Sequence, residues 1–162
     1  MHIRCEVDGD HAAIRAVNQA AIPAAAEANL VDALRDEAEP IVSLVAEMDD
    51  SVVGHVLFSP VTIAGQTRLF ALGLAPMAVM PTYQRQGIGS ALVREGIQQV
   101  TQLGADCVVV LGHPTYYPRF GFVPASEFGL TCEYDVPDDA FMAMELRPGA
   151  LSGRAGLVKY HP

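Results

Sequence analysis

The sequence predicts one α+β domain, and three observations support this fold class. Short runs of β-branched and apolar residues recur between residues 41 and 79, with turn residues between them. Two other segments repeat apolar residues at helical spacing, one near the N-terminus and one at residues 89–103. A wholly apolar run, Cys107–Leu111, follows the second segment and is typical of a strand buried on both faces.

The first 40 residues are expected to form one strand and two helices. Residues 2–7 alternate between polar and apolar side chains, which predicts an opening strand. Asp10 is the expected N-cap of a helix at residues 11–21, and Pro23 ends that helix. A second helix is expected at about residues 24–35.

Three neighbouring antiparallel strands are expected next, at residues 41–47, 52–61 and 66–79. The turn Met48-Asp49-Asp50-Ser51 separates the first two and indicates a hairpin. A further turn at Ala64-Gly65 leads into the third strand.

The second half of the chain is expected to place a crossover helix between two strands. The helix covers residues 89–103, and Gly104 is a natural terminator. The buried run Cys107–Leu111 then completes a βαβ-like unit inside a mainly antiparallel sheet. Residues 120–124 and 141–146 are the expected closing strands, and no element is predicted for the last sixteen residues.

Composition limits the class of protein. The chain has 162 residues, of which 51% are hydrophobic and 18% charged, so a packed globule is expected rather than a disordered chain. A formal net charge of −9 argues against a nucleic-acid partner and is compatible with a cationic amine substrate. No apolar run reaches the ~20 residues of a membrane span, and the N-terminus lacks the apolar core of a signal peptide. We therefore expect a soluble, cytoplasmic protein.

Cysteine usage predicts neither a disulfide framework nor a metal site. Cys5, Cys107 and Cys132 are odd in number and show no metal-ligand spacing. Two of them lie in strand-like runs, where a free cysteine usually behaves as a small hydrophobic residue.

The junction at residues 71–92 predicts an anion-binding site. It combines an apolar strand, a glycine-bearing turn and the start of a helix, whose first backbone N–H groups lack partners within the helix. Gly87 and Gly89 allow the backbone to approach a diphosphate, and Arg85 adds a charged donor. The Rossmann fingerprint fails because Leu92 stands where its third glycine is required, and the P-loop lacks its Gly-Lys-Ser/Thr.

Two motifs in this region resemble one known family. Gln84-x-x-Gly87-x-Gly89 resembles the acyl-CoA-binding motif of the GCN5-related N-acetyltransferase (GNAT) superfamily. Tyr117-x-x-x-Gly121-Phe122 resembles that family's Tyr-x-x-x-Gly-Phe element, and the buried strand lies between the two motifs as the family requires. The run from residue 112 to 122 is similar to a bacterial subgroup of predicted N-acetyltransferases. The match is strongest over residues 71–122.

The resemblance implies a single GNAT-like domain over residues 1–162. Its mixed, mainly antiparallel sheet would be flanked by helices and would carry a V-shaped splay between the fourth and fifth strands, here residues 72–80 and 107–111. Main-chain groups of the fourth strand would pair with the pantetheine arm of the coenzyme. These residues are Ala78, Val79 and Met80. Backbone N–H groups of the following loop would hold the pyrophosphate. These residues are Arg85, Gln86, Gly87, Ile88, Gly89 and Ser90.

The resemblance also implies a direct attack of an amine on the thioester of acetyl-CoA. Tyr117 matches the family's position for the acid that protonates the leaving thiolate, with the adjacent Tyr116 as a substitute. The alternative is that Tyr117 simply packs in the core with its hydroxyl satisfied. A phenol near pKa ~10 and a thiol near ~8.5 are close enough for a proton to pass.

The general base is less well specified. Many family members carry a glutamate on one of the two splayed strands, but neither strand here contains a carboxylate. His113, just after the second of these strands, has a suitable side chain, and its alternative is a loop histidine bonded to backbone. Glu47 and His55 are weaker candidates, and a water chain or an acceptor of low pKa would need no protein base.

Together these features predict an acetyl-CoA-dependent N-acetyltransferase whose partners are an acyl-CoA and an amine acceptor, either a small molecule or a protein amine. Acetyl-CoA would serve as the acyl donor, without a metal. Because the strand carboxylate is missing, a non-catalytic acyl-CoA-binding or regulatory module is the alternative. A different α+β ligand-binding fold with a chance glycine turn is a third possibility.

Overall fold

A computed structural model describes residues 1–22 and 42–160. The helix expected at residues 24–35 lies outside the described residues. Two compact units divide the chain: Met1–Phe58 with Ala75–Val100, and Ser59–Leu74 with Thr101–Pro162. Strands β3 (Ser51–Ile63) and β4 (Ala71–Val79) contribute residues to both units.

Hydrogen bonds join the described strands into one mixed sheet with the order β1-β2-β3-β4-β5-β8-β6, and β9 pairs with both β3 and β7. The α+β fold class is thereby confirmed. The other strands are β1 (His2–Cys5), β2 (Val42–Met48), β5 (Cys107–Leu111), β6 (Val123–Pro124), β7 (Leu130–Cys132), β8 (Phe141–Glu145) and β9 (Gly156–Tyr160). The described α-helices are α1 (His11–Ala21) and α3 (Ile88–Gln102).

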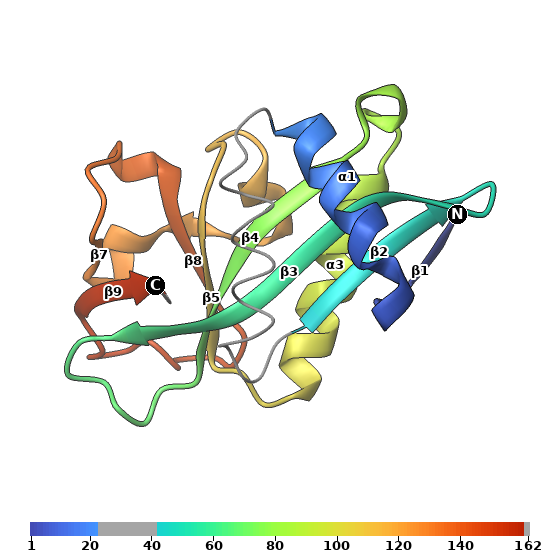
Figure 1. Ribbon diagram of the computed structural model, residues 1–162. Helices are drawn as coiled ribbons and strands as arrows, with labels where there is room; N and C mark the ends of the chain where they lie inside the picture. The colour runs from blue at the N-terminus through green and yellow to red at the C-terminus, as the bar shows by residue number, and fades with distance from the viewer. Residues whose placement is uncertain (23–41, 161–162) are drawn as a thin grey trace. The chain divides into compact units, whose positions relative to one another are not determined.

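The first unit is built on the hairpin of β2 and β3, whose predicted turn is confirmed (Figure 1). Asp49 and Asp50 both adopt left-handed backbone conformations, with φ of 52° and 64°. Two such residues form the tight turn whose twist matches that of paired strands. Met48 consequently pairs with Ser51, and the register of the hairpin shifts between Ala46 and Glu47.

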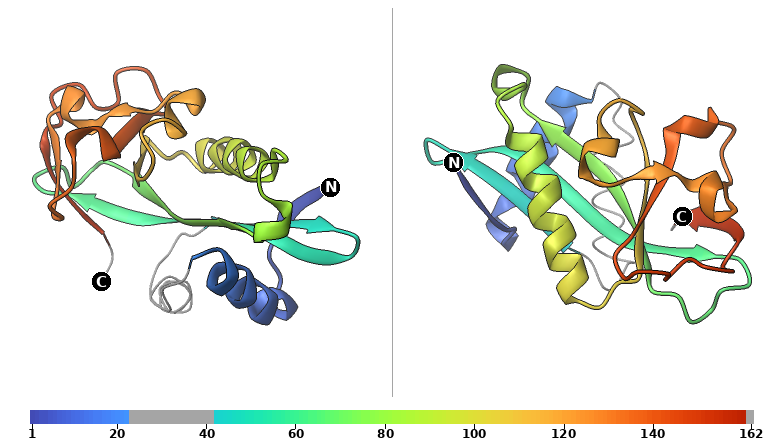
Figure 2. Two further views of the ribbon diagram at one scale, coloured as in Figure 1. Left: turned by 90° about the horizontal axis from the view of Figure 1, so that it is seen from above. Right: turned by 180° about the vertical axis from the view of Figure 1, so that it is seen from behind.

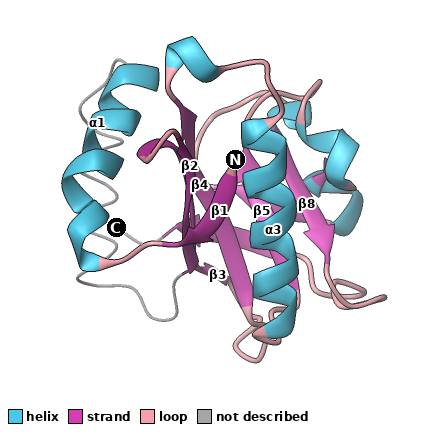
Figure 3. Cartoon of the chain, turned by 90° about the vertical axis from the view of Figure 1, so that its right-hand side faces the viewer, coloured by secondary structure: helices cyan, strands magenta, loops and turns pink. Residues whose placement is uncertain are grey.

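Helices α1 and α3 lie on opposite faces of this hairpin (Figures 2 and 3). Helix α3 packs so closely that a Cβ added at Gly96 would come within 2.2 Å of the Phe58 ring. On the other face, the buried Asn18 of α1 reaches the buried His55 of β3. Side chains alternate between the two faces along a strand, so successive residues of β3 face α3 and α1 in turn.

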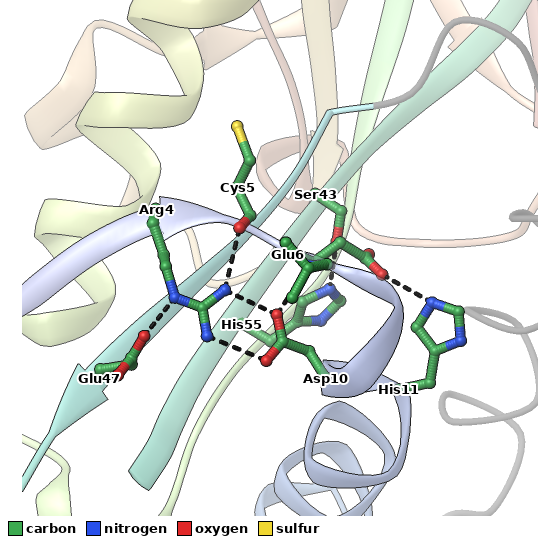
Figure 4. Close-up of polar contacts among 9 residues, drawn as sticks. Arg4, Cys5, Glu6, Asp10, His11, Ser43, Glu47 and His55 are labelled. Atoms are coloured by element: carbon green, nitrogen blue, oxygen red, sulfur yellow. Dashed lines mark hydrogen bonds and ion pairs between the residues drawn. The ribbon is translucent and has the colours of Figure 1, made fainter. Parts of the chain in front are cut away.

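Arg4 connects three segments of the first unit through its side chain (Figure 4). Its guanidinium donates to both carboxylate oxygens of Asp10, at 2.7 and 2.9 Å, and to Glu47 on β2. Asp10 was expected to cap α1, and it occupies that position, but its carboxylate makes no cap bond to the helix. It instead accepts hydrogen bonds from Arg4 and from the Val7 amide, because an arginine fork is the stronger partner.

This arrangement predicts a pH-dependent loss of stability in Asp10→Asn. Hydrogen bonds from Arg4 are the main cause that lowers the pKa of Asp10, so the contribution is present above the unfolded pKa near 3.9 and is lost as pH falls through the lower folded value. We expect urea unfolding at pH 7 to show a loss of about 1–3 kcal/mol in the free energy of unfolding. The difference from the wild type should shrink as pH falls below the unfolded pKa near 3.9. Asp8→Asn, at an exposed neighbour, is the matched control. Equal losses in both variants would contradict the assignment.

The second unit is centred on β5, which is buried from Cys107 to Val110 and partly buried at Leu111. It pairs in parallel with β4, from Ala71 opposite Cys107 to Leu74 opposite Val110, and antiparallel with β8. The ladder to β4 covers these four pairs, whereas β4 itself continues to Val79. Pro76 lacks an N–H to donate beyond that point.

Two strand predictions in this region need correction, and two strands were missed. The strand expected at residues 66–79 begins only at Ala71, because a turn precedes it. The strand expected at residues 120–124 shrinks to Val123–Pro124, since Phe120 belongs to a short 3₁₀ helix, Tyr117–Phe120. The last sixteen residues, for which no element was predicted, contain β9. Strand β7 was not predicted either.

Candidate functional site

The loop that leaves β4 in the first unit is anchored at both of its sides. The Met80 amide donates to the Val53 carbonyl at 2.8 Å, which ties the end of β4 to β3. The Gln84 side chain donates back to the Val79 carbonyl at 2.9 Å. The glutamine of the glycine motif therefore braces the loop in this structure.

Between this brace and α3 the backbone turns through two left-handed residues. Arg85 has φ of 64° and Gly87 has φ of 86°. Such alternating conformations direct successive N–H groups toward one side and form a concave anion site. A Cβ built at Gly87 would meet no atom within 4 Å, so the requirement for glycine is conformational, and the space above it is open.

The start of α3 adds a second set of donors to the same loop. The first helical bond runs from the Ala91 amide to the Gly87 carbonyl at 3.0 Å, so the amides of Ile88 and Gly89 precede the helical ladder. The first turn of α3 carries no acidic residue, and the Arg85 side chain is exposed. Backbone donors, the helix dipole and a cation thus favour an anion here.

Some main-chain groups of the strand residues expected to pair with pantetheine are already hydrogen-bonded within the protein. Ala78 and Val79 are buried at the end of β4. The Met80 amide donates to the Val53 carbonyl, and the Met80 carbonyl accepts from the Tyr83 amide at 2.8 Å. The Val79 carbonyl also accepts from the Gln84 side chain. Any strand-like pairing with a ligand at this end of β4 therefore depends on Ala78 more than on Val79 or Met80.

The second motif forms one compact turn in the second unit. Tyr117 is only 6% exposed, and its ring packs edge-on against Tyr116 and Phe122 at centroid distances of 5.1 and 5.8 Å. Gly121 ends the 3₁₀ helix in a left-handed conformation, with φ of 106°. The glycine therefore turns the chain so that Phe122 can enter the core, which explains the Tyr-x-x-x-Gly-Phe spacing.

Tyr117 also requires a glycine beneath its ring. A Cβ added at Gly112 would lie 2.4 Å from Tyr117 Cε2, so the ring lies directly on the backbone that follows β5. Burial, with a smaller contribution from Tyr116, raises the pKa of Tyr117 to about 12. The hydroxyl is therefore protonated at any physiological pH.

His113 belongs to the same turn as Tyr117. Its carbonyl accepts the Tyr116 amide at 3.0 Å and the Tyr117 amide at 3.4 Å, and its side chain is exposed. The structure thus brings His113 and Tyr117 together in the second unit. The predicted loop residues, from Arg85 to Ser90, are brought together in the first unit.

The two weaker candidates for the base are engaged within the first unit. Glu47 is ion-paired with Arg4. His55 is 0% exposed, with Nε2 2.8 Å from Ser43 Oγ and Nδ1 3.2 Å from Asn18 Nδ2. Sequence alone could not show this, since Asn18 lies 37 residues from His55 along the chain.

The tautomer of His55 follows from the bonds of Asn18. The Asn18 Nδ2 group also donates to the Ile14 carbonyl at 3.0 Å, which orients the amide with its nitrogen toward His55. Nδ1 must then accept and Nε2 must carry the proton toward Ser43. His55 therefore serves as a neutral structural link between α1 and the β2–β3 hairpin.

The described residues show neither a metal centre nor a membrane span. In residues 1–22 and 42–160, no group of three or more histidine, cysteine or acidic side chains is placed to hold a metal ion. None of the helices described is both long and apolar enough to cross a membrane.

Known proteins show the same sequence pattern and fold. The model of the acetyltransferase (GNAT) family matches residues 11–122. The chain is 40% identical to the uncharacterized N-acetyltransferase YhbS of Escherichia coli K12, covering 99% of this chain and 96% of that protein. It is 41% identical to E. coli YjhQ, over 80% of this chain and 74% of that protein.

Two solved structures extend this similarity to three dimensions. The crystal structure of E. coli YhbS in complex with CoA matches with a TM-score of 0.92 and 39% identity, covering 99% of this chain and 89% of that one. A GNAT family acetyltransferase from Brucella melitensis in complex with acetyl-CoA matches with a TM-score of 0.81 and 38% identity, covering 99% and 95%. The family match over most of the chain and the near full-length relatives agree with the loop and turn geometry. The chain therefore belongs to the GNAT family of acetyltransferases.

Proposed function

We propose that this acetyltransferase moves an acetyl group from acetyl-CoA to a primary amine by direct attack, in the cytoplasm. The observation that carries the proposal is the left-handed backbone at Arg85 and Gly87, which leads directly into the start of α3. A coenzyme pyrophosphate matches this site in charge and in its need for several backbone donors. The relatives solved with CoA and acetyl-CoA support the same ligand.

The coenzyme would be held by backbone rather than by side chains. N–H groups from Arg85 to Ser90 would bind the pyrophosphate, and Ala78 and Val79 would offer main-chain groups to the pantetheine arm. The exposed face of Gly87 leaves room for the phosphates, since nothing lies within 4 Å of a Cβ built there. Arg85 would add a charge-assisted hydrogen bond.

In the reaction, the amine nitrogen bonds to the carbonyl carbon of the thioester and the carbon–sulfur bond breaks. Sulfur leaves with the bonding electron pair and takes a proton from the Tyr117 hydroxyl. The attacking nitrogen loses one proton to solvent, and a proton from solvent returns to the Tyr117 oxygen. The products are an amide and the free thiol of coenzyme A. Each step balances without an oxidant, a reductant or a metal.

The raised pKa of Tyr117 bears on this assignment. A donor with a pKa of about 12 would protonate a thiolate of ordinary pKa, near 8.5, only uphill. A thiolate expelled into a dry site is itself more basic, however. Burial, with smaller contributions from Asp106 and Glu145, raises the pKa of the Cys107 thiol on β5 to about 12. A leaving thiolate buried to a similar extent would be matched to the donor.

His113 is the proposed base for the incoming ammonium, because Glu47 and His55 are engaged elsewhere. Its exposed side chain can take a proton and return it to water. An acceptor whose amine is already neutral would not require it.

A screen of amines tests the proposal. Acetyl-CoA is incubated with amines, amino acids, polyamines and N-terminal peptides, and release of free thiol is followed. We expect at least one class to give amine-dependent release. Calorimetric binding of acetyl-CoA without turnover of any amine would instead identify a non-catalytic acyl-CoA-binding module, which the engagement of Glu47 and His55 also favours.

A further inference from the structure

Arg119 belongs to the short 3₁₀ helix that carries Tyr117, and its side chain folds back along that helix. Its Nε donates to the Tyr116 carbonyl at 2.9 Å. Its guanidinium carbon lies over the Tyr116 ring, 4.5 Å from the ring centroid. An exposed arginine of the second unit is thus held at two points by one residue, the one that precedes Tyr117.

The peptide group that joins Tyr116 to Tyr117 is hydrogen-bonded through both its carbonyl and its amide. The carbonyl accepts from the Arg119 side chain at 2.9 Å and from the Arg119 amide at 3.4 Å. The amide, which is the Tyr117 N–H, donates to the His113 carbonyl at 3.4 Å. A short bond from a charged donor is stronger than a long bond from a backbone amide. The Arg119 side chain therefore provides the strongest of these three restraints on the peptide that leads into Tyr117.

The ring of Tyr116 transmits the same restraint to the side chain of Tyr117. The two rings meet edge-on at a centroid distance of 5.1 Å, and Tyr116 also meets Phe120 edge-on at 5.3 Å. Tyr117 and Phe120 complete the triangle at 6.3 Å. Edge-to-face contacts fix the mutual orientation of aromatic rings. Any movement of Tyr116 would therefore be passed to Tyr117.

The remaining neighbours of Tyr117 leave its ring little freedom. A Cβ at Gly112 would lie 2.4 Å from the ring, and Phe122 packs edge-on at 5.8 Å. Burial first, and Tyr116 second, raise the pKa of Tyr117 to about 12, so the hydroxyl keeps its proton until a strong base reaches it. What the neighbouring residues still determine is the direction in which that proton is offered.

We propose that Arg119 is a positioning residue, which holds Tyr116 so that the Tyr117 hydroxyl is fixed in one orientation for protonating the leaving sulfur. This inference rests on the proposed amine acetylation with Tyr117 as its acid. Arg119 acts only through Tyr116 and the peptide that leads into Tyr117. Its removal should therefore slow the proton transfer and leave the binding of the coenzyme unchanged.

The first test is Arg119→Met, with n-butylamine and acetyl-CoA as the probe, together with any amine found in the screen. Methionine keeps an unbranched apolar side chain and removes both the Nε donor and the charge. We expect kcat to fall about fivefold, less than in Tyr117→Phe because the acid is misplaced rather than removed, with an unchanged Kd for acetyl-CoA. Arg68→Met, at another exposed arginine of the second unit, should keep the kcat of the wild type. A wild-type kcat in Arg119→Met would overturn the proposal.

A double variant separates positioning of the acid from a general structural role. If Arg119 acts through the Tyr117 hydroxyl, adding Arg119→Met to Tyr117→Phe should leave kcat within about twofold of Tyr117→Phe alone. A further fivefold fall in the double variant would show that Arg119 acts independently of that hydroxyl, and would overturn the proposal. An unchanged kcat in Tyr117→Phe would refute the acid itself, and this inference with it.

Failure of the proposed function is recognised separately, as acetyl-CoA binding without turnover of any amine. Amide hydrogen exchange, followed residue by residue by NMR, then tests the placement of Tyr117 without any reaction. The Tyr117 amide should exchange about fivefold faster in Arg119→Met than in the wild type or in Arg68→Met, because its peptide has lost its strongest restraint. An exchange rate of the Tyr117 amide equal to that of the wild type would overturn the inference.

Discussion

Gly87→Glu should abolish coenzyme binding, raising the Kd for acetyl-CoA at least 100-fold. Two effects act together. Residue 87 must adopt a φ of 86°, which an L-residue with a side chain reaches only at a cost. A carboxylate would also lie at the proposed pyrophosphate site and repel the pyrophosphate. A loss of about 3 kcal/mol corresponds to the expected factor.

The matched control for this variant is Gly65→Glu. Gly65 also has a left-handed backbone, with φ of 80°, and a Cβ there would likewise meet no atom within 4 Å. It carries the same strain and the same new charge at a turn distant in sequence from the loop. Calorimetry with acetyl-CoA should show ordinary affinity for Gly65→Glu. Affinity within threefold of the wild type in Gly87→Glu would show that the loop does not hold the coenzyme.

Tyr117→Phe should lower kcat at least tenfold and leave the Kd for acetyl-CoA unchanged. The ring still fills the space above Gly112, so the variant removes only the proton that the leaving sulfur would take. Steady-state thiol release with a productive amine measures the effect. Tyr116→Phe is the control, because the two rings are adjacent in sequence and lie 5.1 Å apart. A larger loss in Tyr116→Phe would transfer the role of the acid to Tyr116.

The pH profile gives an independent check on the same assignment. An acid must be protonated to act, so its activity is lost as pH rises through its pKa. With a pKa of about 12, Tyr117 should cause no alkaline decline in kcat up to about pH 10.5. A tyrosine at the ordinary value near 10 would already halve kcat at about pH 10. A half-loss near pH 10 would therefore exclude Tyr117, in this environment, as the donor.

Local sequence signals predicted a helix, a turn and a buried strand. The helix at residues 11–21 begins and ends as expected, because its amphipathic spacing is strong. The turn at Asp49 and Asp50 and the buried strand Cys107–Leu111 are likewise confirmed. These signals lie within a few residues of one another and depend little on the rest of the chain.

Contacts between distant segments account for what the sequence did not reveal. Nothing near His55 in the chain indicates that Asn18 and Ser43 hold it in the interior. Similarly, β9 is recognisable only through its partners on β3 and β7, and Gly73 gains meaning only beneath the Tyr160 ring.

The close contact between Gly96 and Phe58 has a further consequence for how this region tolerates change. The helix rises about 1.5 Å and turns about 100° per residue, so the eight steps from Ile88 to Gly96 set a distance of about 12 Å between the loop before α3 and the Phe58 ring. An inserted or deleted residue in this interval would rotate the first turn of α3 away from the loop, or force a side chain into Phe58. Substitutions on its outer side leave that distance unchanged. The segment from Gly87 to Gly96 should therefore vary in composition during evolution while keeping its length.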